Sequence, residues 1–524
     1  MRVRKIKKCL NVNLIVLFLI ALQLGVIILS MNKKVDFHVD EYFTYGFANS
    51  ASGIWGFLPE DNVQYSGDNV FLNYLTVDMD HRFDYSLVWN NQALDTHPPF
   101  YYAVMHTLCS FFPGTFTRWF GLAANAIFFV IASLLIYAIA KKVFYSSGKA
   151  LFTLIVWGGV TGTVNTAIFI RMYMMVTVFV LAIIFIHLRI YEQNKLTWKF
   201  YLELLLLTIG GALTHYYFLI FIFFTAVFYS IYMLVYRRYK ELGMYIITYA
   251  IAGATSIAIF PTMLYHIFSG GRGKEAFEAF ENGTNYFNQL IEYLKLVTYE
   301  TVGNIWIFGV LCIFTVVFFV NCFSTYGLKK TVYKIFKSPF AGIFIIGLGY
   351  SCIVIRIAPY MTTRYISPVY GLIILSVVAI LIKMGTLLCT KPIMKTMLIG
   401  AFGILIICGT WDYGVQNLFL YKQNAIDTAI VNCDKDVLYV YDGQGWKLPC
   451  NRKELINFRS FTFVQPENLE QYLKEKDLDN SFLYVTATLD QASVIEQIEA
   501  TEVNIDMEYL YNSDYAAVYK ISMQ

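Results

Sequence analysis

Charged residues are scarce in this chain, where Asp, Glu, Lys and Arg make up 15% of 524 residues. A typical soluble domain carries about 25%. Hydrophobic residues reach 57%, and the mean hydropathy is +0.54. These values exclude an ordinary soluble globule. Apolar runs of roughly 17 to 25 residues, long enough to cross a bilayer, recur along most of the chain. We therefore predict a polytopic α-helical membrane protein.

Several motifs are also missing. The nine cysteines form no CxxC pair or Cys/His cluster, so a zinc or iron-sulfur site has no support. The glycine-rich segment 270–275 lacks the strand and the GK[ST] ending of a phosphate loop, and neither a nucleotide site nor a nucleic-acid partner is predicted. No repeat or matched pair of broken helices is visible, which argues against a transporter built from inverted repeats.

The apolar runs predict about eleven transmembrane helices. They lie near residues 13–31, 116–140, 149–170, 172–190, 198–215, 217–236, 243–267, 304–322, 339–357, 365–383 and 396–411. No small-residue cleavage site follows Ser30, so the first run is expected to be an uncleaved span. Lys and Arg accumulate in short cytoplasmic loops, and here they precede the first span and occupy every second connection. The amino terminus is therefore expected in the cytoplasm and the carboxyl terminus outside.

Two domains are predicted. Residues 1–411 would form the membrane domain, with a long first extracytoplasmic loop at 32–115. Within this loop, PPFYYAVMHTLCSFF is apolar but too short to span, and is expected to be a juxtamembrane helix. Residues 412–524 carry 9 Lys and Arg against 18 Asp and Glu, whereas residues 1–411 carry 31 against 18. This change in composition marks the tail as a separate, soluble, extracytoplasmic domain.

The tail is expected to be a small α/β domain. Its predicted strands are VLYVY, FLYVTA and YAAVYKI, and its predicted helices are PENLEQYLKEKD (466–477) and DQASVIEQIEAT (490–501). Cys433 and Cys450 differ from the other cysteines because they lie in this polar region. They could form a disulfide if the tail faces an oxidising compartment, or remain free thiols, and the sequence leaves both possibilities open.

Two adjacent carboxylates, Asp40 and Glu41, follow the first span closely, in the aromatic segment FHVDEYFTYGFAN. One interpretation is a helix cap or a solvated loop. The other is a general base, because a carboxylate partly removed from water accepts a proton more readily. Adjacent helical residues point about 100° apart, so only one of the two needs to face a given cavity.

Cationic side chains gather on the outer side of the predicted topology. His97 precedes two prolines that fix the backbone at the start of the juxtamembrane helix. Arg171, Arg356 and Arg364 lie at the outer ends of spans, and His215 lies on the same side. A single arginine in such a place usually extends towards water. Several on one face are suited to binding a phosphate.

The order of these motifs resembles that of GT-C glycosyltransferases that use polyprenyl-phosphate sugars, in particular protein O-mannosyltransferases and lipid A aminoarabinose transferases. Over roughly residues 13–383, the matching motifs are Asp40-Glu41, HPPFYY at 97–102, RMY at 171–173, THYY at 214–217 and RYISP at 364–368. The resemblance implies a membrane hexosyl- or pentosyltransferase. It would move a sugar from a polyprenyl-phosphate donor to an acceptor hydroxyl at the extracytoplasmic face, with inversion.

The resemblance also implies residue roles. Asp40 would be the catalytic base, and Glu41 would help to place the acceptor. The residues expected to bind the donor and its phosphate are His97, Arg171, His215, Arg364 and Tyr365. Lipid A aminoarabinose transferases have a lysine at the position of His97, so the charge at this contact would depend on pH.

Three alternatives stay open: a metal site, a transporter, and a non-catalytic surface protein that presents the acidic tail. No cofactor is expected, but Asp78 and Asp80, followed by His81, could bind a divalent metal. The protein could instead be a transporter or flippase for a lipid-linked or anionic solute, with the arginines lining its pathway. Neither the sugar nor the acceptor (glycan, lipid or protein) can be predicted. The Lys-, Ile- and Tyr-rich composition points to a bacterial plasma membrane and to undecaprenyl phosphate as the carrier.

Overall fold

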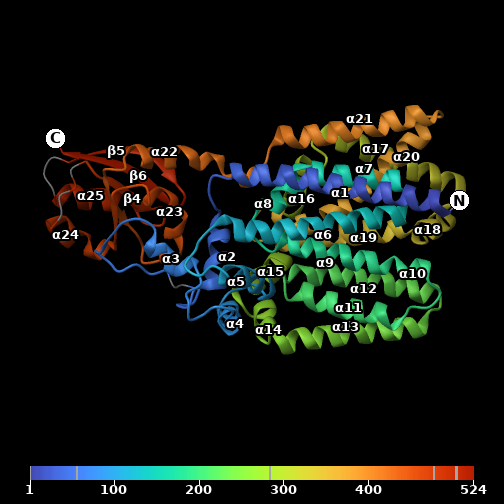
Figure 1. Cartoon of the computed structure of the whole chain (residues 1–524), viewed down its shortest axis with the longest axis horizontal. Coiled ribbons are helices and arrows are strands. Elements are labelled where there is room, and N and C mark those ends of the chain that lie inside the picture. The colour runs from blue at the N-terminus through green and yellow to red at the C-terminus, as the bar shows by residue number, and fades with distance from the viewer. Residues whose placement is uncertain are drawn as a thin grey trace. The chain divides into compact units, whose positions relative to one another are not determined.

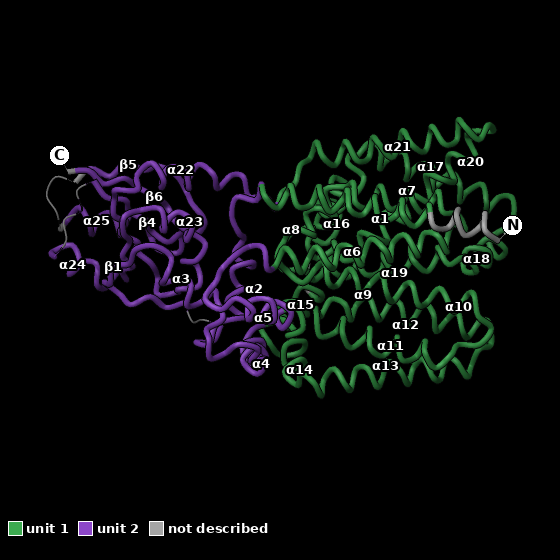
Figure 2. Tube along the Cα trace, in the orientation of Figure 1, with its two compact units in different colours: residues 1–32, 96–101, 121–416 green, residues 33–95, 102–120, 417–524 purple. Residues whose placement is uncertain are grey.

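The computed structural model describes residues 2–54, 57–282, 285–475, 478, 480–501 and 505–523. The chain divides into two compact units, which are coloured separately in Figure 2. Unit 1 comprises residues 1–32, 96–101 and 121–416, and unit 2 comprises residues 33–95, 102–120 and 417–524. Each unit therefore combines segments that lie far apart in the sequence.

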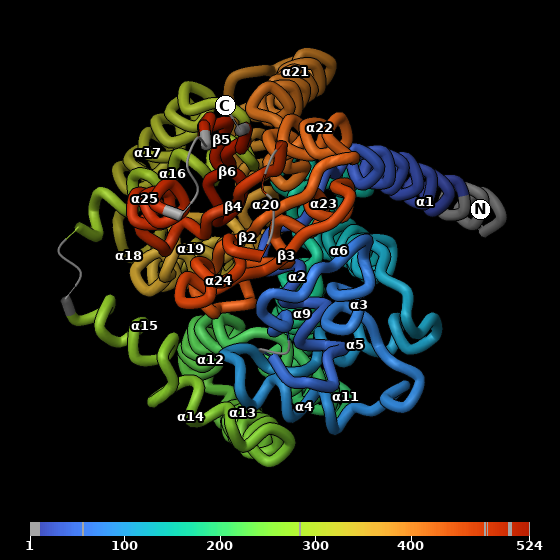
Figure 3. The backbone as a smooth tube through the Cα atoms, turned by 90° about the vertical axis from the view of Figure 1, so that its left-hand side faces the viewer, coloured from blue at the N-terminus to red at the C-terminus, as the bar shows by residue number. Residues whose placement is uncertain are grey.

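Unit 1 is a bundle of long apolar helices, most of which are seen nearly end-on in Figure 3. The helices that lie wholly or mostly in it are α1 (Arg2–Lys33), α6 (Arg118–Phe144), α7 (Ser147–Gly159), α8 (Thr161–Ile168), α9 (Tyr173–His187), α10 (Arg189–Glu192), α11 (Trp198–Ala212), α12 (Tyr217–Val235), α13 (Tyr239–Ile259), α14 (Thr262–Phe268), α15 (Gly271–Asn282), α16 (Tyr286–Thr301), α17 (Ile305–Tyr326), α18 (Leu328–Phe336), α19 (Pro339–Ile357), α20 (Tyr370–Leu388) and α21 (Pro392–Tyr413). Two short 3₁₀ helices, η1 (Thr363–Tyr365) and η2 (Ser367–Val369), precede α20.

The predicted fold class, a polytopic helical membrane protein with a small carboxyl-terminal α/β domain, is confirmed. Each predicted span coincides with a helix or helix pair. In the described part of the chain, nine helices are long and apolar enough to cross a membrane, or ten if the bent pair α7–α8 is one span. The predicted count of eleven is not confirmed, because α11 has only 15 residues. That corresponds to about 22 Å, less than the hydrocarbon thickness of a bilayer.

The bend between α7 and α8 is a local feature that the hydropathy pattern does not reveal. The two helices meet at 58°, and every residue of α8 is buried although several are polar. Thr161 replaces part of the interrupted helical hydrogen bonding, because its N–H donates to Thr410 Oγ1 (3.2 Å) and its hydroxyl to Thr410 O (3.0 Å). Where a helix breaks inside an apolar bundle, the freed backbone N–H and C=O groups need replacement hydrogen bonds of this kind.

Unit 2 is built on a mixed sheet of six described strands, in the order β1-β3-β2-β4-β6-β5. The strands are β1 (Gln64–Tyr65), β2 (Asp436–Val440), β3 (Ser460–Val464), β4 (Phe482–Thr486), β5 (Ile505–Ser513) and β6 (Ala516–Met523). Strand β2 is parallel to both β3 and β4, and the other pairs are antiparallel. In Figure 3 the strands from β5 to β3 follow one another in this order.

Both faces of the sheet are covered. On one face, Leu438 and Leu483 belong to an apolar core with Leu469 of α24 (Pro466–Glu475) and Ile498 of α25 (Gln491–Thr501). On the other face, Phe463 packs edge-on against Phe57, with ring centroids 6.2 Å apart. Because both faces are buried, the central strands are almost continuously apolar.

The remaining elements of unit 2 come from the first loop and the tail. They are α2 (Val39–Asn49), α3 (Asn69–Leu75), α4 (Tyr85–Leu94), most of α5 (Phe100–Ser110), the 3₁₀ helices η3 (Gln416–Leu418), η4 (Leu420–Lys422) and η5 (Gly445–Asn451), and helices α22 (Gln423–Val431) and α23 (Arg452–Leu455). Several are labelled in Figure 1. Helix α5 occupies the position of the predicted juxtamembrane helix.

The tail has the predicted strands and helices, together with β3 and β5, which were not predicted. Residues 476 and 477, at the end of the first predicted tail helix, lie outside the described residues. Cys433 is exposed, Cys450 is buried, and both are free thiols. The tail shares its compact unit with residues 33–95 and 102–120, so the first loop folds with the tail, whereas the sequence placed it with the membrane domain.

Candidate active site

The first turn of α2 carries the two carboxylates singled out from the sequence. His38 and Glu41 form a capping box, in which His38 Nδ1 accepts a hydrogen bond from the N–H of Asp40 (3.1 Å) and Glu41 Oε2 accepts one from the N–H of His38 (2.9 Å). Reciprocal bonds of this kind satisfy backbone donors that the helix start leaves open. They fix the direction in which the first turn projects its side chains.

Glu41 is fully buried, with 0% of its side chain exposed. Its Oε1 lies 2.9 Å from Lys34 Nζ, and Lys34 also donates to the carbonyl oxygen of Asn417 (3.1 Å). Burial lowers the pKa of Lys34, while the carboxylate of Glu41 opposes that shift. These contacts hold α2 on the segment that follows α1. The expected role of Glu41 in placing an acceptor stays a prediction.

Asp40 has a different environment, although it directly precedes Glu41 in the chain. Its side chain is 19% exposed, and Oδ2 lies 3.7 Å from His38 Nδ1. It is therefore partly withdrawn from water without being sealed in the core. This is the condition under which a carboxylate can act as a general base.

A second group of candidate residues lies in unit 1. His97 lies just before α5, where the N–H of Phe100 donates to Leu213 O (2.9 Å) and so ties this segment to the end of α11. Arg171 is buried, and its Nη2 lies 3.2 Å from His97 Nε2. A guanidinium group can only donate, so His97 Nε2 is the acceptor of this hydrogen bond.

The group continues through aromatic rings to a second arginine. The ring of His215 lies 6.1 Å from that of His97 and 5.6 Å from that of Tyr173. The ring of Tyr365 lies 6.3 Å from that of Tyr173, and Arg364 Nη2 donates to the Tyr365 hydroxyl (3.2 Å). We call this set the arginine–histidine cluster; its members are His97, Arg171, Tyr173, His215, Tyr217, Arg364 and Tyr365.

The structure thus brings together all five residues that the sequence analysis expected to bind the donor, although their binding roles stay predictions. Tyr173 and Tyr217 were not assigned roles, even though they belong to the RMY and THYY motifs. The ring of Tyr217 lies 5.6 Å from that of Tyr365, and its N–H donates to His215 Nδ1 (3.0 Å). Arg356 points elsewhere and donates to Phe280 O at 2.8 Å.

A buried carboxylate supports the segment that carries Arg364, and sequence reasoning missed it. Glu300 is 4% exposed, and it accepts hydrogen bonds from Asn165 Nδ2 (3.0 Å) and the Tyr370 hydroxyl (2.5 Å). It also accepts one from the side chain of Thr363, the first residue of η1. Glu300 therefore joins η1 to α8 and α20. The sequence signal for it was one of the two acidic residues of the amphipathic segment 286–301, near its end.

This arrangement depends on a glycine. A Cβ atom at Gly162 in α8 would lie 2.8 Å from both the carbonyl oxygen of Glu300 and the ring of Tyr370. The first contact would push α8 away from α16, and the second would displace the ring of Tyr370 in α20. The close approach of α8 and α16 therefore requires glycine at this position.

The alternative metal site at Asp78 and Asp80 has a different local explanation. Asp78 Oδ1 accepts hydrogen bonds from the N–H groups of Asp80 (3.0 Å) and His81 (2.9 Å), as in an Asx turn. The Asp78 carboxylate also accepts a hydrogen bond from His81 Nδ1 (2.8 Å), and this bond raises the pKa of that imidazole. In the part of the chain that the structure describes, no group of three or more His, Cys, Asp or Glu residues could hold a metal ion.

The chain resembles solved structures over almost its whole length. ArnT from Cupriavidus metallidurans bound to undecaprenyl phosphate covers 96% of this chain and 97% of its own, with a TM-score of 0.54 and 11% identity. The same protein in the apo state gives a TM-score of 0.49 at 10% identity, over 95% of this chain and 97% of that one. The archaeal oligosaccharyltransferase AglB from Archaeoglobus fulgidus, in complex with an inhibitory peptide and a dolichol-phosphate, gives a TM-score of 0.36 at 10% identity. That match covers 96% of this chain and 74% of the AglB chain.

Comparisons by sequence give a different result. No protein-family model matches the chain, and no curated protein matches it. The likeness to the first of the solved structures is therefore a likeness of fold, which persists at an identity too low for sequence methods to detect.

Proposed function

Because the chain has the GT-C fold, we propose that it is an integral-membrane glycosyltransferase that moves a sugar from a polyprenyl-phosphate donor to an acceptor hydroxyl. The observation that carries this proposal is the arginine–histidine cluster, in which cationic, imidazole and phenol groups from four separate segments meet within unit 1. ArnT, which shares the fold, is bound to undecaprenyl phosphate in its structure. This supports a lipid phosphate as the ligand.

The cluster would bind the leaving group. When the bond between the anomeric carbon and the phosphate oxygen breaks, its electron pair goes to that oxygen and negative charge develops on the phosphate. Arg171 and Arg364 are suited to this charge because a guanidinium presents several donors in a fixed plane. Donors that are already in position stabilise the transition state without further reorganisation.

Asp40 would act on the acceptor. As the acceptor oxygen bonds to the anomeric carbon, its proton passes to the carboxylate of Asp40. The phosphate leaves from the opposite face of the sugar, so the anomeric configuration inverts. The products are a glycosylated acceptor and a polyprenyl phosphate. We place this reaction at the extracytoplasmic face, with the amino terminus in the cytoplasm, because of the Lys and Arg distribution among the predicted loops.

The Asp40→Asn variant tests the assignment of the base. An amide is nearly the same size as a carboxylate but cannot accept the proton, so we expect transfer to fall by about 10² to 10⁴-fold. The measurement is the rate at which purified protein in nanodiscs transfers a labelled sugar from undecaprenyl phosphate. Binding of the donor lipid should persist, because Asp40 is not in the cluster that holds the phosphate.

Asp80→Asn is the matched control. Asp80 is an exposed aspartate of the same unit, so its substitution removes an equal charge and should leave transfer unchanged. A wild-type rate in the Asp40→Asn protein would remove Asp40 from the reaction. A loss in Asp80→Asn that added divalent metal reverses would instead support the metal alternative.

A transporter or flippase is the second candidate, and the bent pair α7–α8 is the observation that favours it. Broken helices commonly form binding sites in secondary transporters. In that case the arginines would hold an anionic or lipid-linked solute that leaves unaltered. Chemical change of the donor therefore separates the two functions.

A further inference from the structure

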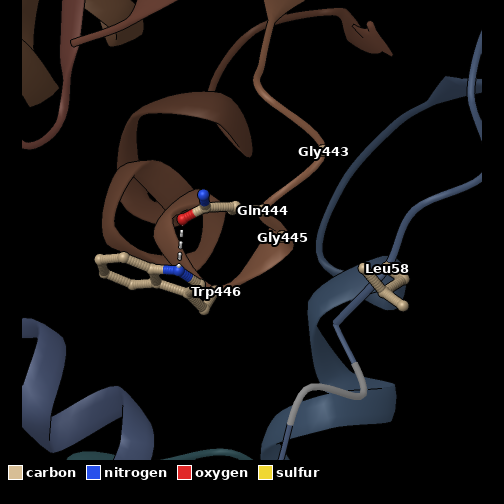
Figure 4. A pocket seen from close by; sticks show the side chains of 5 residues that line it. All are labelled: Leu58, Gly443, Gln444, Gly445 and Trp446. Atoms are coloured by element: carbon tan, nitrogen blue, oxygen red, sulfur yellow. Dashed lines mark hydrogen bonds between the residues drawn. The ribbon is translucent and has the colours of Figure 1, made fainter. Parts of the chain in front are cut away.

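Unit 2 contains a cavity of about 340 Å³ to which the proposed reaction assigns no role. Its lining residues are Leu58, Gly443, Gln444, Gly445 and Trp446, and Figure 4 shows them from close by. The volume lies at the small end of the range for ligand pockets, which starts at about 300 Å³. None of the lining residues is charged, so an ionic ligand would find no partner there.

The loop that forms the cavity is held in place by a buried lysine and by a close backbone contact. Lys447 is 3% exposed, and its Nζ donates to both Asp442 Oδ2 (2.5 Å) and Thr488 Oγ1 (2.9 Å). A Cβ atom at Gly445 would lie 1.8 Å from the carbonyl oxygen of Phe57, so only glycine permits this approach. The cavity wall is therefore a fixed part of the fold.

The cavity combines an aromatic ring with amide donors. The indole of Trp446 packs against Phe43 and Tyr515, with ring centroids 5.9 and 5.6 Å away. Its Nε1–H donates to Gln444 Oε1 (3.1 Å), which is the dashed line in Figure 4. Gln444 is exposed, and its amide nitrogen donates to no residue that the structure describes. Its two N–H groups are thus available to a ligand.

These groups match an uncharged sugar ring. A pyranose has an apolar face of C–H groups, which packs on an indole, and a rim of hydroxyls, which accept from amide N–H groups. A phosphate or a carboxylate would need a cation instead. The chemistry of the lining therefore favours a neutral saccharide.

The cavity is adjacent to the helix that carries Asp40. Phe43, whose ring contacts Trp446, lies three residues after Asp40, which is nearly one turn of α2. The 3₁₀ helix η5 begins in the cavity wall at Gly445 and ends beyond Cys450. Helix η5 packs against α2.

We infer that this cavity is the acceptor subsite and that the acceptor is a saccharide, bound by one neutral sugar residue on Trp446 and Gln444. The inference rests on the proposed function, because a cavity beside the base can be an acceptor subsite only if the protein catalyses glycosyl transfer. It assigns the acceptor to the glycan class and places its recognition on unit 2.

Direct binding to the full-length protein in detergent tests the inference without turnover. The probes are maltose and the disaccharide of N-acetylglucosamine, and saturation-transfer NMR measures their dissociation constants. We expect both probes to bind to the wild type and the dissociation constant to rise by about tenfold in Trp446→Ala, which loses the stacking surface. Gln444→Ala should weaken binding by about threefold, and because this side chain is exposed, the variant should fold normally.

Two further proteins complete the experiment. Trp446→Phe keeps a ring and should retain most of the binding. Trp306→Ala removes an exposed tryptophan of unit 1 and should change nothing. Equal binding in all variants, or no binding of either probe to the wild type, would overturn the inference. So would Trp446-dependent binding of a neutral Ser/Thr-rich peptide in place of the sugars, which would indicate a protein acceptor. Cleavage of the lipid-linked donor by the wild type tests the proposed function separately.

Discussion

Asp40 and Glu41 show how two adjacent carboxylates can have different environments in one helical turn. Glu41 is fully buried and paired with Lys34, whereas 19% of the Asp40 side chain is exposed. The helical offset of about 100° between neighbours produces this difference. The helical offset alone predicted that only one of them needs to face a cavity, and the family resemblance assigned the role of base to Asp40. The burial of Glu41 beside Lys34 could not be predicted, because Lys34 also bonds to Asn417 of a distant segment.

Glu454 in α23 gives a prediction for the pH dependence of stability. It is 5% exposed and accepts hydrogen bonds from Tyr484 (2.9 Å), Asn451 and Ser513. Burial raises its pKa from an ordinary value of 4.5 to about 6. As the pH rises, the unfolded chain loses this proton near pH 4.5, whereas the folded tail keeps it until about pH 6. The contribution of Glu454 to the stability of the tail is therefore highest below pH 4.5 and falls as the pH rises through 6. One and a half pKa units correspond to about 2 kcal/mol.

Hydrogen exchange of the full-length protein measures this effect at the strands of the tail. After correction for intrinsic exchange, protection in β2 and β4 should be higher at pH 5 than at pH 7.5. The Glu454→Gln variant has no titrating group at this site, so most of the difference should disappear. Equal protection of the wild type at both values of pH would contradict the prediction.

At the level of elements, the buried pair Lys34–Glu41 is expected to hold α2 in place. Lys34→Met leaves the Glu41 carboxylate buried without its cation, which costs about 3–5 kcal/mol. In the double variant Lys34→Met/Glu41→Met both charges are absent, and we expect at least half of the lost stability to return. Thermal unfolding of the detergent-solubilised proteins gives the comparison. A double variant no more stable than Lys34→Met would show that the capping role of Glu41 matters more than the ion pair.

The 3₁₀ helix η1 is expected to depend on Glu300. In Glu300→Ala, the side chains of Thr363, Asn165 and Tyr370 lose a common acceptor, so the backbone that carries Arg364 is less constrained. If Arg364 binds the donor phosphate, the KM for the donor should rise by about tenfold with a smaller change in kcat. Glu300→Gln keeps one oxygen acceptor and should fall between alanine and the wild type. An unchanged KM in Glu300→Ala would remove Glu300 from the positioning of Arg364.

Some elements could be predicted from the sequence because their signals are local. The apolar runs marked the long helices, and the β-branched and aromatic runs marked β2, β4 and β6. Strand β1 has only two residues and exists because it pairs with β3, far away in sequence, so no local pattern reveals it. The break at Val160 lies inside an apolar run and depends on bonds to Thr410.

In the candidate site, too, residues with a local sequence signal could be predicted and residues defined by long-range contacts could not. Histidines and arginines were noticed because cations are rare in apolar spans and these share one predicted face. Tyr173 and Tyr217 were not, because aromatic residues are common throughout the chain. Glu300 acts through contacts with Asn165 and Tyr370, 135 and 70 residues away. A contact between such distant segments has no signature in a single sequence.

For the whole molecule, the shared unit of loop and tail predicts the effect of truncation. Deleting residues 417–524 removes Lys422, which pairs with Asp36, and Arg452, which pairs with Asp68. It also exposes Phe57, which packs on the sheet. We expect the truncated protein to aggregate in mild detergent, as seen by size-exclusion chromatography. Arg452→Ala, which breaks one contact alone, should stay monodisperse. An active, monodisperse truncated protein would show that the tail is accessory.

The resemblance to GT-C glycosyltransferases, first drawn from short motifs, is confirmed at the level of the fold. Fold alone does not determine chemistry, and the central claim is that this protein breaks the bond between a sugar and a lipid phosphate. The decisive measurement uses the purified full-length chain in liposomes that contain undecaprenyl phosphate linked to a labelled hexose, with an added saccharide that supplies the acceptor hydroxyl. We predict release of free undecaprenyl phosphate by the wild type and its loss in Asp40→Asn. Movement of the intact donor between leaflets, without bond cleavage and equally in both proteins, would contradict the account.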